Sequence, residues 1–130
     1  MDKKKILIVD DEPDVLMLLG ERLTTVGYEV IKATSGKEAI DAAAAARPHL
    51  IIMDIAMPEM DGSEAANVIR SHAQTKDIPI IFLTCLFTKQ EEKACGHYLG
   101  QNFFIAKPYD VNDLLREIET RISQKQPDQA

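Results

Sequence analysis

The sequence predicts an α/β fold, in which a five-stranded parallel sheet carries helices on both faces. Four short apolar runs are continuous rather than alternating, which is typical of strands buried on both faces. They span residues 6–9, 50–53, 78–83 and 103–106. Helical patterns separate the runs, and a mixed run at 28–33 suits an edge strand. The predicted order is therefore βαβαβαβαβα, one domain over residues 1–123 with a polar tail at 124–130.

The first helix is predicted from apolar residues that recur at helical spacing, namely Val15, Leu19, Leu23 and Val26. Pro13 suits its first turn and Gly27 its C-terminal end. Ser35 and Glu38 have the spacing of a capping box before an alanine-rich helix that runs to Ala46.

Three more helices complete the alternation. Gly62 precedes the third, which carries Ala65, Ala66, Ile69 and Ala73. The fourth, at 88–98, is weaker because Gly96 costs a helix about 1 kcal/mol relative to alanine. Asp110 caps the last helix, whose apolar stripe is Val111, Leu114, Leu115, Ile118 and Ile122. Pro79 stands near the start of its strand, where a missing N–H is tolerated.

Composition excludes several classes of protein. The 130 residues carry a net charge of −6, which argues against independent nucleic-acid binding. Cys85 and Cys95 fit no zinc or redox spacing, so we expect buried thiols in a reducing cytosol. No apolar run approaches the roughly 20 residues of a membrane helix. We therefore expect a cytoplasmic protein without a membrane partner.

Polar side chains follow the predicted strands where sites of open α/β sheets form, outside the carboxyl ends of the strands. The first strand is followed by Asp10 and Asp11, the third by Asp54, the fourth by Thr84 and the fifth by Lys107. Any one of them alone is as easily a turn former, a helix cap or a solvated surface residue. Their recurrence at successive strand ends favours a shared site.

Such a cluster requires a cation. Two carboxylates about 4 Å apart repel by roughly 4 kcal/mol at an effective dielectric constant near 20. Oxygen ligands suit Mg2+, which keeps several waters and bridges to phosphoryl groups. With the Lys107 ammonium opposite, the site is suited to an anionic phosphoryl group. Asp54 is then a candidate nucleophile, and Thr84 a candidate donor to a phosphoryl oxygen.

Four motifs carry a resemblance to a known family. They are Ile-Val-Asp-Asp-Glu at 8–12, Met-Asp-Ile-Ala-Met-Pro-Glu-Met-Asp-Gly at 53–62, Phe-Leu-Thr at 82–84 and Lys-Pro at 107–108. From about Lys4 to Ile122 the chain resembles the receiver domain of two-component response regulators, in the single-domain form of the chemotaxis regulators. The resemblance implies a flavodoxin-like strand order 2-1-3-4-5 and a cis peptide between Lys107 and Pro108.

The resemblance also assigns roles to the site residues. Asp54 is the phosphoacceptor, and Thr84 and Lys107 contact the phosphoryl oxygens. Mg2+, for which Mn2+ can substitute, is held by Asp10, Asp11, Asp54 and the backbone carbonyl of Ala56. The phosphoryl group comes from a sensor histidine kinase or a histidine phosphotransfer protein. The chain then catalyses only its own phosphorylation and dephosphorylation and is otherwise not an enzyme.

Phe104 departs from the commonest family pattern, and two variable positions bear on the lifetime of the phosphoryl group. Phe104 stands where tyrosine is common, and it either rotates inward as Thr84 is drawn to the phosphoryl group or simply packs. Ala56 and Leu86 are apolar, so neither orients a hydrolytic water, and we expect slow self-dephosphorylation. A receiver would fill these 130 residues, whether the chain is a whole protein or a piece of a longer one, so we expect this chain to signal through a downstream protein rather than nucleic acid.

Three other functions remain to be weighed. A phosphohydrolase of the haloacid-dehalogenase kind needs its nucleophile on the first strand and a second acid two residues later. Here Asp54 follows the third predicted strand, and the residue two positions after it is Ala56. A flavodoxin-like cofactor carrier needs a phosphate-cradling loop after the first strand, and Asp10, Asp11 and Glu12 would repel phosphate. A scaffold that has lost phosphorylation is the hardest of these alternatives to exclude, although all five key residues are present.

Overall fold

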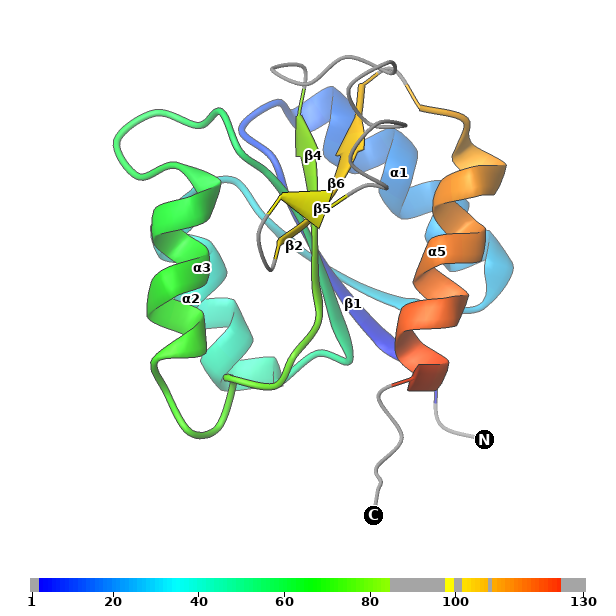
Figure 1. The fold of residues 1–130 in the computed structure, drawn as a ribbon. Coiled ribbons are helices and arrows are strands. Elements are labelled where there is room, and N and C mark those ends of the chain that lie inside the picture. Colours follow the sequence, from blue (N-terminus) through cyan, green and yellow to red (C-terminus); the bar gives the residue numbers. More distant parts are fainter. Residues whose placement is uncertain (1–2, 85–97, 100–101, 108, 125–130) are drawn as a thin grey trace.

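The computed structural model describes residues 3–84, 98–99, 102–107 and 109–124. The strands are β1 (Lys5–Val9), β2 (Glu29–Ala33), β3 (Leu50–Asp54), β4 (Ile80–Thr84), β5 (Tyr98–Leu99) and β6 (Asn102–Ala106). The helices are α1 (Pro13–Val26), α2 (Gly36–Ala46), α3 (Gly62–Arg70) and α5 (Val111–Gln124), all visible in Figure 1. Cys85, Cys95, most of the predicted fourth helix (88–97) and the end of the tail (125–130) lie outside the described residues.

The sheet order is β2-β1-β3-β4-β6-β5. All neighbours from β2 to β6 pair in parallel, so the five strands predicted from the sequence do have the order 2-1-3-4-5. The two-residue β5 was not predicted, and it pairs antiparallel with β6 at the edge. Its first residue, Tyr98, is the last residue of the predicted fourth helix, so that boundary was wrong.

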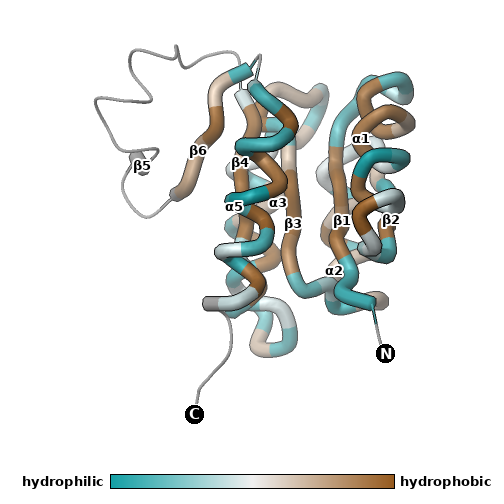
Figure 2. The backbone as a smooth tube through the Cα atoms, turned by 90° about the vertical axis from the view of Figure 1, so that its right-hand side faces the viewer, coloured by the Kyte–Doolittle hydropathy of each residue, from teal (hydrophilic) through white to brown (hydrophobic). Residues whose placement is uncertain are grey.

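Two apolar cores lie on opposite faces of the sheet. Helices α1 and α5 cover one face, and α2 and α3 cover the other (Figure 1). Every residue of β3 and β4 is buried. Figure 2 shows the resulting apolar strands β1, β3 and β4 at the centre of the molecule. The continuous apolar runs therefore mark strands covered on both sides, as predicted.

Strand β4 begins at Ile80, two residues later than predicted. Pro79 lies just outside it, and its carbonyl oxygen accepts a hydrogen bond from the N–H of Ile51 at 3.0 Å. Proline has an acceptor but no donor, so it can close the entry to the strand without belonging to the ladder.

Helix α1 begins at Pro13, and the left-handed Gly27 (φ 115°) ends it by donating to the carbonyls of Leu23 and Thr24. Its buried stripe is rotated from the prediction. Leu16, Leu19 and Leu23 are buried, whereas Val26 is 52% exposed. Both sets recur at helical spacing, and contact with the sheet decides which one is covered.

Capping differs from the prediction at two helices. At α2 the Ser35 hydroxyl accepts from the N–H of Glu38 at 3.1 Å, but the Glu38 carboxylate accepts from Thr34 instead of completing the box. At α3 a full capping box joins Asp61 and Glu64, which the sequence analysis missed. Gly62 lies inside α3 and Ala73 beyond its end.

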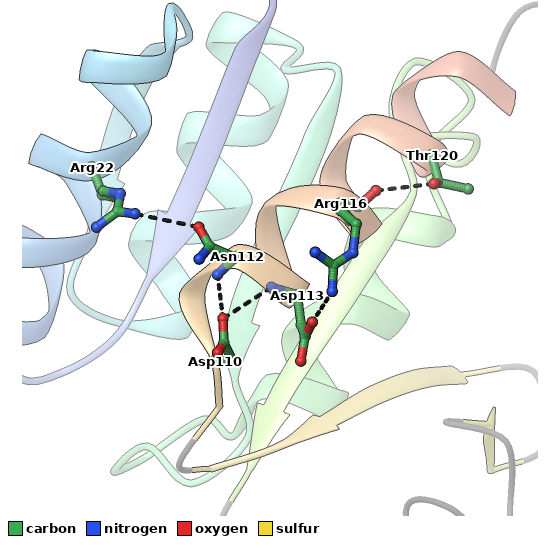
Figure 3. Close-up of polar contacts among 6 residues, drawn as sticks. All are labelled: Arg22, Asp110, Asn112, Asp113, Arg116 and Thr120. Carbon is green, nitrogen blue, oxygen red and sulfur yellow. Dashed lines mark hydrogen bonds and ion pairs between the residues drawn. The ribbon is translucent and has the colours of Figure 1, made fainter.

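Helix α5 is capped as predicted. One Asp110 carboxylate oxygen accepts from the backbone N–H of Asn112 at 2.8 Å and of Asp113 at 3.4 Å (Figure 3). The Arg22 guanidinium of α1 donates to the side-chain oxygen of Asn112 at 3.4 Å, and Arg116 pairs with Asp113. The first turn of α5 is thereby tied to α1. Among the described helices, none has the length and apolar character needed to cross a bilayer.

Candidate functional site

Asp10 lies directly after β1 and is 3% exposed. Its N–H donates to the carbonyl of Ala33 at 3.2 Å, which ties it to the end of β2. One of its carboxylate oxygens, Oδ1, accepts from the N–H of Glu12 at 2.9 Å. The backbone of the β1–α1 loop thus fixes the orientation of this carboxylate and leaves Oδ2 for other partners.

Asp54 is the last residue of β3 and is 7% exposed. The N–H of Ala56 donates to its Oδ1 over 3.4 Å. On the next strand, Thr84 is the last residue of β4, is 3% exposed, and pairs in register with Ala106 of β6. The carboxyl ends of β1, β3 and β4 therefore bring these side chains to one edge of the sheet, as the sequence predicted.

Three carboxylates converge at this edge. Asp10, Asp11 and Asp54 each offer an oxygen, and these oxygens all lie within 4.8 Å of one another. Asp10 and Asp54 are buried, whereas Asp11 is exposed. Such a hard, all-oxygen donor set, open to solvent on one side, fits a divalent cation of the Mg2+ type that retains water ligands.

Lys107 follows β6 and joins the two buried carboxylates. Its ammonium nitrogen Nζ lies 3.4 Å from Oδ2 of Asp10 and 3.6 Å from Oδ2 of Asp54. Its backbone N–H donates to the carbonyl of Thr84 at 2.9 Å, which fixes the base of the side chain against the end of β4. The five key residues predicted from strand ends thus do lie at the same edge.

The electrostatics of the site are unbalanced. Burial raises the pKa of Asp54; the Lys107 charge lowers it, the Asp10 charge raises it, and the net shift is upward. Burial lowers the pKa of Lys107, but the two carboxylates outweigh burial and the net pKa is raised. The two carboxylates therefore stabilise the charged form of Lys107. Burial destabilises the ionised form of Asp54, and a bound cation would offset that cost.

Gly62 positions the loop that follows Asp54. A Cβ at this residue would lie 2.5 Å from the backbone oxygen of Asp54, so only glycine allows this approach. The N–H of Gly62 donates to the carbonyl of Ile55 at 2.9 Å, and Asp61 caps the helix that begins there. The sequence analysis took Gly62 for a residue before the helix and missed this role.

Phe104 lies two residues before Ala106 on β6 and is partly buried. Its ring stacks on that of Phe82 of β4, with centroids 5.2 Å apart and an interplanar angle of 26°. Of the remaining predicted site residues, Ala56 is exposed, while Leu86 and Pro108 lie outside the described residues, as does the conformation of the Lys107–Pro108 peptide.

Comparison with known proteins agrees with this geometry. The family model "Response regulator receiver domain" matches residues 6–119. "Probable transcriptional regulator ycf27" of Porphyridium aerugineum is 36% identical over 94% of this chain and 48% of its own length. The chain thus spans about half of the curated relatives that it matches.

Two solved structures illustrate the structural match. Chemotaxis protein CheY4 of Vibrio cholerae has a TM-score of 0.78 and 34% identity, covering 92% of this chain and 98% of that one. The receiver domain of sensor histidine kinase PA1611 of Pseudomonas aeruginosa, solved with magnesium in its active-site cleft, has a TM-score of 0.79 and 28% identity, covering 94% and 99%. Because the family model matches residues 6–119 of the 130, the chain belongs to the response regulator receiver domains, which are signalling switches rather than metabolic enzymes.

Proposed function

We propose that this receiver domain is a phosphorylation-dependent switch of a two-component phosphorelay, with Asp54 as its phosphoacceptor. The observation that supports this most directly is the convergence of Asp10, Asp11 and Asp54 within 4.8 Å, with Lys107 bridging two of them. Like charges so close together are unfavourable in a site without a ligand, and clusters of this kind accompany function.

The transfer requires Asp54 to act as a nucleophile. A carboxylate oxygen of Asp54 forms a bond to phosphorus as the phosphorus–nitrogen bond of a phosphohistidine breaks, and the imidazole leaves with that electron pair. The products are an acyl phosphate on Asp54 and a free histidine on the donor. The N–H of Ala56 and the ammonium of Lys107 both contact the Asp54 carboxylate and hold it in place for this attack.

The cation belongs to the same proposal. Mg2+, or Mn2+ in its place, would be held by the carboxylates of Asp10, Asp11 and Asp54 with the backbone carbonyl of Ala56, and it would neutralise charge on the transferring phosphoryl group. The PA1611 receiver domain was solved with magnesium in its active-site cleft.

Lys107 and Thr84 would stabilise the product. After transfer, the Lys107 ammonium contacts phosphoryl oxygens in place of the Asp54 carboxylate, and the Thr84 hydroxyl donates to another of them. Phosphorylation then shifts the populations of two conformations. The aromatic side chain that responds is Phe104, which lies two residues before Ala106 on β6.

We propose a sensor histidine kinase or a histidine phosphotransfer protein as the donor, which places the reaction in the cytoplasm, and a downstream protein as the receiver of the signal. The unit responsible is residues 1–123. Relatives are named transcriptional regulators, but this chain spans about half their length, so contact with nucleic acid is not proposed for it.

The test is phosphorylation by a small donor. The chain is incubated with Mg2+ and acetyl phosphate and then weighed intact by mass spectrometry. We expect the wild-type chain to gain one phosphoryl group. No group should be gained when EDTA is added before the donor, and none by Asp54→Ala. A wild-type chain that gains nothing, or an Asp54→Ala chain that still gains the group, would refute the assignment.

A further inference from the structure

The switch residue Phe104 is held by contacts on the face of the sheet that α2 and α3 cover. Phe82 and Phe104 are register partners on adjacent strands, and their rings stack with centroids 5.2 Å apart. Phe82 is completely buried, and Phe104 is partly buried against the same apolar core. The conformation of Phe104 therefore depends on what it gains from the Phe82 ring.

A cation lies over that ring. Arg70, the last residue of α3, places its guanidinium carbon 5.9 Å from the centroid of Phe82. Burial lowers the pKa of Arg70, which means that the cation has lost part of its hydration. A partly desolvated guanidinium is attracted to an aromatic face more strongly than a fully hydrated one.

The arginine also affects the stack between the two rings. Two parallel aromatic rings present negative faces that repel unless the rings are offset. A cation over Phe82 draws electron density toward itself and lowers this repulsion, so it strengthens the contact of Phe82 with Phe104. Losing the charge should weaken the stack without removing either ring.

Position on the sheet connects the stack to the candidate site. Residues two apart on a strand share a face, so Thr84 lies on the same face as Phe82 and one step nearer the carboxylates. Its register partner is the small residue Ala106, which lies two residues beyond Phe104. The side chains of Phe104 and Thr84 therefore lie on one face of neighbouring strands, and we expect a movement of one to affect the space open to the other.

We propose that Arg70 is a positioning residue for the switch: acting through Phe82, it holds the Phe104 ring in its stacked conformation. The end of α3 thereby sets the balance between the stacked and released positions of Phe104. The proposal rests on the proposed function only in taking Phe104 as the residue that responds to phosphorylation.

The experiment follows the Phe104 ring by NMR, through the ring-current shift that Phe82 imposes on it, before and after phosphorylation with acetyl phosphate and Mg2+. For Arg70→Met, which keeps the aliphatic stem, we expect the ratio of stacked to released Phe104 to fall about three- to tenfold. Arg70→Lys keeps the charge and should restore most of the wild-type ratio. If Arg70→Met fails to fold, Arg70→Gln replaces it.

The chain offers a matched control on the other face of the sheet. There the guanidinium carbon of Arg121 lies 3.8 Å from the ring centroid of Phe103, which belongs to the other core. Arg121→Met removes the same kind of contact and should leave the Phe104 signal unchanged.

The proposal is overturned if Arg70→Met leaves the Phe104 signal unchanged, if Arg121→Met shifts it equally, or if Arg70→Lys behaves as Arg70→Met. Intact mass, measured on the same samples, keeps the two ideas apart. A wild-type chain that gains no phosphoryl group contradicts the proposed function. A chain that is phosphorylated, but whose ratio of stacked to released Phe104 is the same with Arg70 as with Arg70→Met, contradicts this inference alone.

Discussion

The two ends of the parallel sheet treat their polar groups differently. At the amino end, the N–H of His49 donates to the carbonyl of Lys5 at 2.8 Å, and the N–H of Lys5 donates to Nδ1 of His49 at 3.0 Å. At the carboxyl end, the carboxylates of Asp10 and Asp54 contact the Lys107 ammonium and lie beside each other. At the amino end, backbone groups form hydrogen bonds, whereas at the carboxyl end carboxylates of like charge lie close together.

This difference separates stability from function. The two hydrogen bonds at the amino end join the residues at the start of β1 and just before β3. The carboxyl end carries a net negative charge against a burial penalty, which is the usual mark of a site that awaits a ligand. Substitutions at the two ends should therefore give opposite patterns, and the following predictions test that separation.

Among variants that keep the Asp54 phosphoacceptor, the largest effect is expected for Lys107→Met. Removing a cation directed at the site should lower the rate of phosphorylation by acetyl phosphate about 10²- to 10³-fold, because no other described side chain brings positive charge to both Asp10 and Asp54. Lys5→Met, at the amino end, is the control and should leave the rate within about twofold. The rates are measured by intact mass over time, and equal rates for the two variants would end the distinction.

Next comes His49→Ala. Without the imidazole nitrogen, the Lys5 N–H loses its acceptor, and the free energy of unfolding should fall by about 1–3 kcal/mol. His49→Asn offers an oxygen near the position of Nδ1 and should recover part of the loss. Urea unfolding measures both. Phosphorylation of the folded His49→Ala chain should proceed at the wild-type rate, and a slowed rate would contradict the separation of the two ends.

Asp54→Asn should have the opposite pattern, abolishing phosphorylation while stabilising the fold at neutral pH, because it removes a buried charge that faces the Asp10 carboxylate. Because the folded pKa of Asp54 is raised, its protonated form stabilises the fold at low pH, and this contribution is lost as pH rises through the folded pKa. The advantage of Asp54→Asn over wild type should therefore grow from acid to neutral pH.

Denaturant unfolding across that pH range tests this prediction. Mg2+ at neutral pH should stabilise wild type more than Asp54→Asn, since the variant has lost one candidate ligand. An advantage that shrinks toward neutral pH would show that Asp54 is not destabilised by its surroundings.

The smallest effect concerns the lifetime of the phosphoryl group. Ala56 is exposed beside the Asp54 loop and cannot orient water. Ala56→Asn should speed loss of the phosphoryl group about two- to tenfold, less than a true general base would, because an amide only positions the water. Leu86→Glu should act in the same direction. The measurement is the decay of the phosphorylated mass after the donor is removed, and unchanged lifetimes would refute the idea.

Much of the fold could be predicted because strands buried on both faces leave continuous apolar runs. The site could be predicted because parallel strands bring their carboxyl ends together, so Asp10 and Lys107, 97 residues apart in sequence, meet at one edge. Both predictions rest on local sequence features, namely the apolar runs and the polar residues that directly follow them.

What the sequence did not reveal depends on long-range contact. The approach of Gly62 to the Asp54 carbonyl and the stack of Arg70, Phe82 and Phe104 join different elements and leave no local pattern. The Asp61–Glu64 capping box was different, since its spacing is visible in the sequence and could have been found. Which apolar residues of α1 are buried also depends on a long-range contact, because the sheet beneath the helix decides which side is covered.

The central claim is that Asp54 itself carries the phosphoryl group, and reductive trapping tests it most directly. The chain is treated with Mg2+ and acetyl phosphate and then with borohydride, which reduces an acyl phosphate on aspartate to homoserine, and peptide mass spectrometry locates the change. We predict homoserine at position 54 and at neither Asp10 nor Asp11. Homoserine at either of those positions, or no reduced residue in a chain that has gained a phosphoryl group, would contradict the account.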